Sequence, residues 1–125
     1  MLSSSKVTAM LPAVDLDRAR RFYEQTLGLP PARVRENGEA RYESGGLSFA
    51  LYPRGTPTRA DHTALSFEVA NLAAEMKALR ARGVRFEEYD LPGLKTVEGV
   101  CVLGAERAAW FRDTEGNILC IHQDG

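Results

Sequence analysis

The sequence predicts an α+β fold built from two βαβββ repeats. A strand-like segment followed by a capped helix occurs twice, and the first apolar residues of the two helices, Leu16 and Leu72, lie 72 − 16 = 56 positions apart. Short strand-like segments separated by glycine-containing turns follow each helix. The chain has 125 residues, of which 44% are hydrophobic, and this is enough for one compact domain with its own core.

The first repeat begins with a predicted strand at residues 7–14. Asp15 is a good N-cap for the helix that follows, and Gly28, shortly before Pro30, ends that helix. The apolar residues of the helix share one face: Leu16, Ala19, Phe22, Tyr23 and Leu27. The helix is therefore expected to pack this face on a sheet and to leave its charged side in solvent.

Three short antiparallel strands are predicted next, at residues 32–36, 40–43 and 47–52. The pair Asn37-Gly38 favours a type I′ hairpin between the first two of these strands. Residues 54–61 are rich in Pro, Gly and Thr, and they are predicted to be a linker. The first repeat therefore covers about residues 6–53.

The second repeat, about residues 62–123, follows the same order. Its helix is capped by Asn71 and ended by Gly83. Its strand-like segments are residues 62–69, 84–89, 100–103, 108–112 and 117–122, with a turn at residues 113–116. Residues 90–99 have no counterpart in the first repeat, and they fit either a lid-like loop or a long surface hairpin.

Composition argues against several classes of partner. The formal net charge is −1 with both signs interspersed, so neither a nucleic-acid surface nor a polybasic membrane patch is expected. The chain has no apolar run that approaches the roughly 20 residues needed to span a bilayer, and residues 1–6 lack a signal core. Cys101 and Cys120 lie in apolar, strand-like contexts, which favours free buried thiols. We therefore expect a cytoplasmic protein whose partners are small molecules or copies of itself.

Two segments carry a family resemblance. AVDLDRARRFYEQTLGL at residues 13–29 and FRDTEGN at residues 111–117 resemble the vicinal oxygen chelate superfamily. This superfamily includes glyoxalase I, extradiol dioxygenases, fosfomycin-modifying enzymes and bleomycin-resistance proteins. The resemblance implies that the two βαβββ repeats form an open, cup-shaped mixed sheet with the helices outside. It also implies a single domain over residues 1–125 and a homodimer.

The resemblance further implies where a metal would be held. The metalloenzymes of this superfamily take ligands from cup-facing strand positions, which in this sequence are Thr8, Ala50, His62 and Cys120. Only His62 is a usual ligand, Ala50 has no donor atom, and Cys120 stands where a carboxylate is expected. We therefore predict no metal and no cofactor. A softer trio of Cys120, His122 and His62 is the alternative set of metal ligands.

Strand alternation predicts the wall of a ligand pocket. The expected ligand-binding residues are Thr8, Met10, Ala50, Tyr52, His62, Ala64, Trp110, Cys120 and His122. The same strand faces also hold Pro12, Ser48, Ser66 and Ile118. The wall is mostly apolar with a few hydroxyl and imidazole groups, which is typical of small-molecule sites. The small side chains of Ala50 and Ala64 would leave room for a ligand. Two alternatives stay open: Trp110 fits a core position as well as a stacking platform, and the whole wall fits packing between the repeats.

The predicted function is metal-independent binding of a small apolar or aromatic molecule, similar to the bleomycin-resistance branch. His62, Tyr52 and His122 would orient the polar edge of the ligand, and no catalytic residue is assigned. One alternative is a lyase or isomerase related to glyoxalases or dioxygenases, with a degenerate metal site. Another is a dimerisation or regulatory module that has no ligand.

Overall fold

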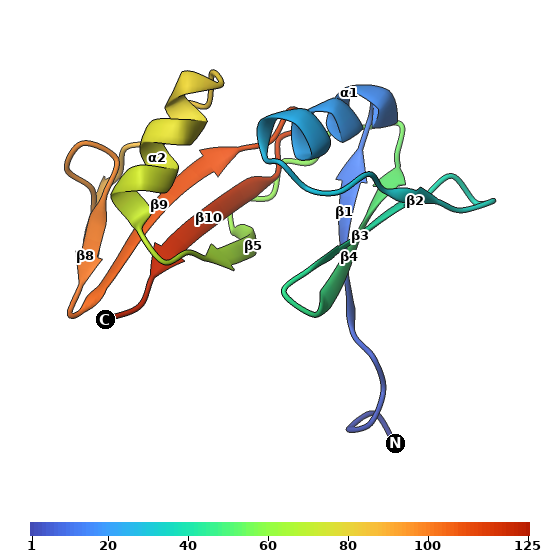
Figure 1. Cartoon of the computed structure of the whole chain (residues 1–125), viewed down its shortest axis with the longest axis horizontal. Helices are drawn as coiled ribbons and strands as arrows, with labels where there is room; N and C mark the ends of the chain where they lie inside the picture. Colours follow the sequence, from blue (N-terminus) through green and yellow to red (C-terminus); the bar gives the residue numbers. More distant parts are fainter. The chain divides into compact units, whose positions relative to one another are not determined.

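The computed structural model describes all residues from Met1 to Gly125, which form two compact units. The first unit is Met1–Thr58 and the second is Arg59–Gly125, so the boundary falls in the predicted linker. Each unit contains one open, four-stranded mixed sheet together with its helix (Figure 1). The predicted α+β fold is confirmed. No helix of the chain is long and apolar enough to cross a membrane.

Along the sequence, the first unit has one strand before its helix and three strands after it. Its elements are β1 (Thr8–Ala13), α1 (Leu16–Arg21), η1 (Phe22–Thr26), β2 (Arg33–Val34), β3 (Ala40–Ser44) and β4 (Leu47–Pro53). The strand order is β1-β4-β3-β2, and β1 runs parallel to β4 while the other pairs are antiparallel. Asp15 caps α1 as predicted, because its Oδ1 accepts a hydrogen bond from the backbone N–H of Arg18 at 3.0 Å.

The predicted helix of the first unit changes type in its second half. After α1 the chain continues as the π-helical segment η1, in which the backbone N–H of Leu27 donates to the carbonyl of Phe22 at 2.9 Å. The hydrogen bond of a π turn spans one residue more than the hydrogen bond of an α turn. Tyr23 of this segment is completely buried and its ring lies 5.8 Å from that of Tyr42 on β3. The apolar face of the helix is thus directed at the sheet.

Glu24 connects this helical segment to the sheet. Its Oε2 accepts hydrogen bonds from the hydroxyl of Tyr42 at 2.8 Å, from Nε of Arg20 at 3.0 Å and from the backbone N–H of Ala32 at 3.3 Å. Burial alone would raise the pKa of the Glu24 carboxyl, but the hydrogen bonds from Tyr42 and Arg20 outweigh it and lower that pKa. Burial and the nearby Glu24 raise the pKa of Tyr42. The carboxylate and the neutral phenol are therefore the stable pair at neutral pH.

The hairpin between β2 and β3 differs from the prediction. Gly38 has a φ of 88°, but Asn37 does not have the positive φ that a type I′ turn requires. The backbone N–H of Gly38 instead donates to the carbonyl of Arg35 at 2.9 Å. The loop is therefore an Arg35–Gly38 turn in which only Gly38 adopts the left-handed conformation, and β2 is shortened to two residues.

The second unit repeats this topology. Its elements are β5 (Thr63–Glu68), α2 (Leu72–Ala81), β6 (Asp90–Leu91), β7 (Leu94–Lys95), β8 (Cys101–Leu103), β9 (Glu106–Arg112) and β10 (Ile118–Gln123). The sheet order is β5-β10-β9-β8, with β5 parallel to β10. Asn71 caps α2 through its Oδ1, which accepts from the backbone N–H of Ala74 at 3.0 Å. Both units therefore place the last strand of the repeat beside the first.

Two segments of the second unit correct or resolve the sequence prediction. Residues 84–89 do not form the predicted strand, because their pairing with β9 is limited to an isolated bridge between Phe86 and Phe111 and one backbone hydrogen bond from Glu87 to Trp110. Residues 90–99 contain a small hairpin of β6 and β7. This segment therefore has the form of a hairpin, and a lid role for it stays a prediction.

The predicted turn before the last strand is held by one buried carboxylate. Asp113 Oδ1 accepts from the backbone N–H groups of Glu115 at 2.8 Å and Asn117 at 2.9 Å. Its Oδ2 accepts from the side-chain amide of Asn117 at 2.8 Å. Gly116 provides the positive φ, 93°, that the turn requires. This turn sets the direction in which β10 enters the sheet.

Replacing Glu24 with Gln should lower the free energy of unfolding by about 1–3 kcal/mol at pH 7, because the hydrogen bonds to its carboxylate are charge-assisted. The folded-state pKa of Glu24 is lowered, so this stabilisation is present above the ordinary pKa of 4.5 and disappears as the pH falls through the folded-state value. Urea unfolding of both proteins between pH 3 and pH 7 measures the difference.

The matched control is Glu36→Gln, because Glu36 is solvent-exposed on the β2–β3 turn. This substitution should change the stability by less than about 0.5 kcal/mol. A stability gap for Glu24→Gln that stays constant down to pH 3 would show that the charge of the carboxylate is not what stabilises the contact.

Candidate functional site

The best-defined group of chemically capable side chains lies on the sheet of the second unit. Strand pairing aligns Ser66 of β5 and Trp110 of β9 on either side of Cys120 of β10. The next row along β10 aligns Glu68 with His122. Because paired residues project to the same side of a sheet, these side chains share one face. The opposite face holds the buried Leu119, Ile121 and Phe111.

Ser66 links the two polar groups of β10. Its hydroxyl lies 2.6 Å from Nδ1 of His122, in a hydrogen bond whose direction depends on the tautomer of the ring. It also forms a hydrogen bond with the thiol of Cys120. On the other side of the ring, His122 Nε2 lies 3.6 Å from Oδ1 of Asp124. Cys120, Ser66, His122 and Asp124 thus form one continuous polar row.

Cys120 is a protonated thiol at neutral pH. It is only 4% exposed, and burial raises its pKa although hydrogen bonds with Ser66 and the backbone of Ala109 act in the opposite direction. Its Sγ lies 3.5 Å from the carbonyl of Ile121, to which it donates. Because the thiolate is the reactive form, this environment disfavours a nucleophilic or metal-binding role for Cys120. Cys101 is likewise a buried free thiol, as predicted.

An aromatic pair borders the polar row. The rings of Tyr89 and Trp110 meet edge to face, with centroids 5.7 Å apart and an interplanar angle of 82°. Trp110 Nε1 donates to Oγ1 of Thr63 at 3.1 Å, which fixes the indole on the sheet. Burial, with a contribution from the charge of Glu87, raises the pKa of the Tyr89 hydroxyl. That hydroxyl is therefore a hydrogen-bond donor at neutral pH.

The structure brings together some of the predicted site residues of the second unit. Trp110, Cys120 and His122 share the face as expected. Ser66 of the predicted wall lies on this face as well. No pattern in the sequence assigned Tyr89, Glu68 or Asp124 to a site. Continued alternation from Ser66 along β5 could have indicated Glu68, whereas Tyr89 lies immediately before the short strand β6 and its position beside Trp110 depends on tertiary packing.

His62 and Ala64 do not lie as alternation predicted. Ile118 pairs with Thr63 but the next residue, Leu119, pairs with Leu65, so a bulge at Ala64 interrupts the alternation of β5. Thr63 therefore lies beside Ile118, where unbroken alternation back from Ser66 would place Ala64. His62 precedes β5 and is exposed. A ligand contact by His62 or Ala64 stays a prediction.

The predicted site residues of the first unit lie on the face of its sheet that is turned away from Leu11 and Phe49. Thr8 pairs with Ser48, Met10 with Ala50, and Pro12 with Tyr52. Met10 is 47% exposed while Ala50 is completely buried. Arg41, which no sequence pattern had assigned to the wall, is the other neighbour of Ala50. The guanidinium of Arg41 bonds to Glu39 at 3.3 Å, and its buried Nε has no hydrogen-bond partner.

The residues at the positions that the superfamily uses for a metal do not fit one. Ala50 offers no donor atom, Cys120 is held as a protonated thiol, and His62 lies outside the strand. A catalytic zinc normally has three protein ligands. These positions therefore do not provide a ligand set in this chain, and no chemical step is assigned to a metal there.

Comparison with known proteins agrees with this topology. The model of the Glyoxalase/Bleomycin resistance protein/Dioxygenase superfamily matches residues 7–121. No curated protein matches the sequence.

Three solved structures illustrate the likeness of fold. TnmS3, an antibiotic-binding protein from Streptomyces sp., is 23% identical, with 100% of this chain and 99% of that chain covered and a TM-score of 0.73. Lactoylglutathione lyase from Agrobacterium tumefaciens is 19% identical, with 96% and 93% covered and a TM-score of 0.69. The fosfomycin resistance protein FosX from Listeria monocytogenes is 15% identical, with 98% and 94% covered and a TM-score of 0.73.

In a Cys101→Ser background, Cys120 should react with Ellman's reagent at least about tenfold more slowly than free cysteine at pH 8, because it is buried and its pKa is raised. The rate should increase as the pH rises above 9, the ordinary thiol value. Stopped-flow absorbance measures both, and denaturant should restore full reactivity. A reaction as fast as that of free cysteine at pH 7 would contradict the buried, protonated state.

Proposed function

The chain belongs to the Glyoxalase/Bleomycin resistance protein/Dioxygenase superfamily, and from this membership we propose that it binds a small apolar or aromatic molecule without using a metal. One observation carries the proposal: the aromatic pair Tyr89 and Trp110 borders the polar row of Cys120, Ser66 and His122 on one sheet face. Aromatic surface combined with a few convergent polar groups is the usual composition of a small-molecule site.

Each group in the row has a role that its chemistry supports. Trp110 and Tyr89 offer ring surface to an aromatic or apolar ligand. Ser66 and His122 offer a hydroxyl and an imidazole, which donate or accept according to the tautomer of the ring, so they suit the polar edge of a ligand. The thiol of Cys120, neutral and small, provides an uncharged floor.

Binding rather than catalysis is supported by the state of the titratable groups. The raised pKa of Cys120 disfavours nucleophilic attack, and the residues at the superfamily's metal positions lack a ligand set. The description of TnmS3 as an antibiotic-binding protein supports the same type of activity for a chain of this fold, although its 23% identity establishes the fold alone.

The proposal also includes the expectations that concern the whole chain. Met10, Thr8, Ala50 and Tyr52 of the first unit remain predicted ligand contacts, together with His62 and Ala64. The chain would act as a single domain, as a homodimer, and in a reducing compartment such as the cytoplasm, where its thiols stay free. Light scattering coupled to size-exclusion chromatography checks the dimer: a mass twice the 13.8 kDa of the chain is expected, and the mass of a monomer would contradict it.

Binding should be visible in the fluorescence of Trp110, which is the only tryptophan of the chain. We expect hits from a library of aromatic antibiotics and metabolites to quench or shift this emission, with EDTA present, and to raise the melting temperature. A ligand at 100 times its Kd adds about 2.7 kcal/mol to the stability. Tyr89→Ala should weaken the binding of an aromatic hit by up to about tenfold, because one edge-to-face ring contact is lost.

Leu91→Ala is the control for this experiment, since Leu91 is 56% exposed on the β6–β7 hairpin. It should leave the affinity unchanged. Loss of binding in EDTA would contradict metal independence. A hit that stabilises the protein without changing the emission of Trp110 would place the ligand away from the aromatic pair, and the absence of any hit would favour a ligand-free interaction module.

A further inference from the structure

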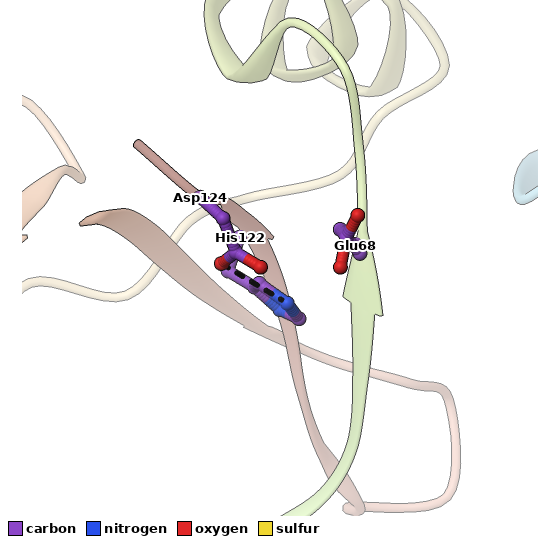
Figure 2. Close-up of side chains that lie close together, drawn as sticks. All are labelled: Glu68, His122 and Asp124. Atoms are coloured by element: carbon purple, nitrogen blue, oxygen red, sulfur yellow. Dashed lines mark ion pairs between the residues drawn. The ribbon is translucent and has the colours of Figure 1, made fainter. Parts of the chain in front are cut away.

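We propose that the ends of β5 and β10 carry a site for a divalent transition-metal cation, formed by Glu68, His122 and Asp124 (Figure 2). The possible ligand atoms of these three residues all lie within 4.8 Å of one another. The site goes beyond the proposed ligand binding, because it lies at the end of the polar row. It uses Nε2 of His122, whereas Nδ1 of the same ring faces Ser66. It includes none of the positions from which the superfamily takes its metal ligands.

The backbone brings the three residues together. Glu68 is the last residue of β5 and pairs directly with His122 of the parallel strand β10. Asp124 follows two residues later and turns back toward the ring, so that its Oδ1 lies 3.6 Å from His122 Nε2 (Figure 2). Two segments that are distant in sequence, the end of β5 and the end of β10 with the residue that follows it, therefore supply an imidazole and two carboxylates at one point.

The imidazole is already oriented for an ion. The hydroxyl of Ser66 holds Nδ1 at 2.6 Å, which leaves Nε2 directed toward Asp124. Metal-binding histidines commonly have their second nitrogen fixed by a hydrogen bond in this way. A cation on Nε2 would place the ring proton on Nδ1, and Nδ1–H would then donate to Oγ of Ser66.

The geometry and the donor types indicate the class of ion. Zinc binds imidazole nitrogen and carboxylate oxygen at about 2.0–2.2 Å, so neighbouring ligand atoms around a tetrahedral ion are about 3.3 Å apart. The observed 3.6 Å is close to this value, and the exposed Glu68 and Asp124 side chains are free to adjust. One nitrogen and two carboxylates suit Zn²⁺ or Mn²⁺ better than a soft ion such as Cu⁺. A divalent charge would also relieve the repulsion between the carboxylates.

Titration of the tag-free, full-length protein with ZnCl₂ in an isothermal calorimeter tests the site. Wild type should bind one ion per chain. His122→Gln should abolish this binding, and Glu68→Gln and Asp124→Asn should each weaken it at least about tenfold because each removes one ligand. Ser66→Ala, which removes only the hydrogen bond that orients the ring, should weaken it by about tenfold. Nitrogen NMR should show a change in the chemical shift of Nε2 of His122 when zinc is added.

The chain provides matched controls. His62→Gln removes the only other histidine, and Asp90→Asn removes an exposed aspartate of the same unit; both should retain the ion. Circular dichroism confirms that each variant is folded. Because the titration contains no organic ligand and the fluorescence assay contains EDTA, failure of the metal site and failure of the proposed ligand binding are separate results.

Three results would overturn the proposal. The first is unchanged zinc affinity in His122→Gln, and the second is a wild-type Kd weaker than about 1 mM. The third is loss of the ion in Cys120→Ser or His62→Gln, which would place the metal on the softer trio of Cys120, His122 and His62. Retention of the ion by both of these variants, together with its loss in His122→Gln, supports the site at the strand ends.

Discussion

The parallel pairing of the first and last strands of each repeat is the constraint on which the rest of the structure depends. β1 pairs with β4 and β5 with β10, although more than thirty residues separate the strands of each pair. A parallel pair requires a crossover, and here the crossover contains a helix whose apolar side covers one face of the sheet. That arrangement commits residues such as Leu51 and Leu119 to the core. It leaves their neighbours on the other face for function.

On that other face of the second unit, the β5–β10 pairing brings chemically different side chains into contact. Ser66 reaches both Cys120 and His122 only because parallel register sets β5 beside β10. Burial keeps the thiol neutral, while the imidazole stays partly accessible at the end of the strand. The polarity of this face therefore increases along β10, from the uncharged thiol of Cys120 beside Trp110 to the carboxylate of Asp124 just after the strand.

His122 joins the two proposed activities. Its Nδ1 faces Ser66, whereas its Nε2 faces Asp124. An ion on Nε2 would make Nδ1 a permanent donor, so that Ser66 would present its own proton to a ligand. Binding of an ion and binding of an organic molecule would then influence each other through one imidazole, with equal and reciprocal effects on the two affinities.

The sequence by itself determined the repeat, the helix caps Asp15 and Asn71, and the Asp113 turn, because these depend on residues that are close together in the chain. Alternation also placed Cys120 and His122 correctly on one face. Only the tertiary structure decided the bulge at Ala64, which interrupts the alternation of β5, and the failure of residues 84–89 to form a strand. It also decided that Ser66, Glu68 and Asp124 surround His122. Strand register is set by pairing between distant segments, and a one-residue bulge changes which side chains meet without a clear local signal.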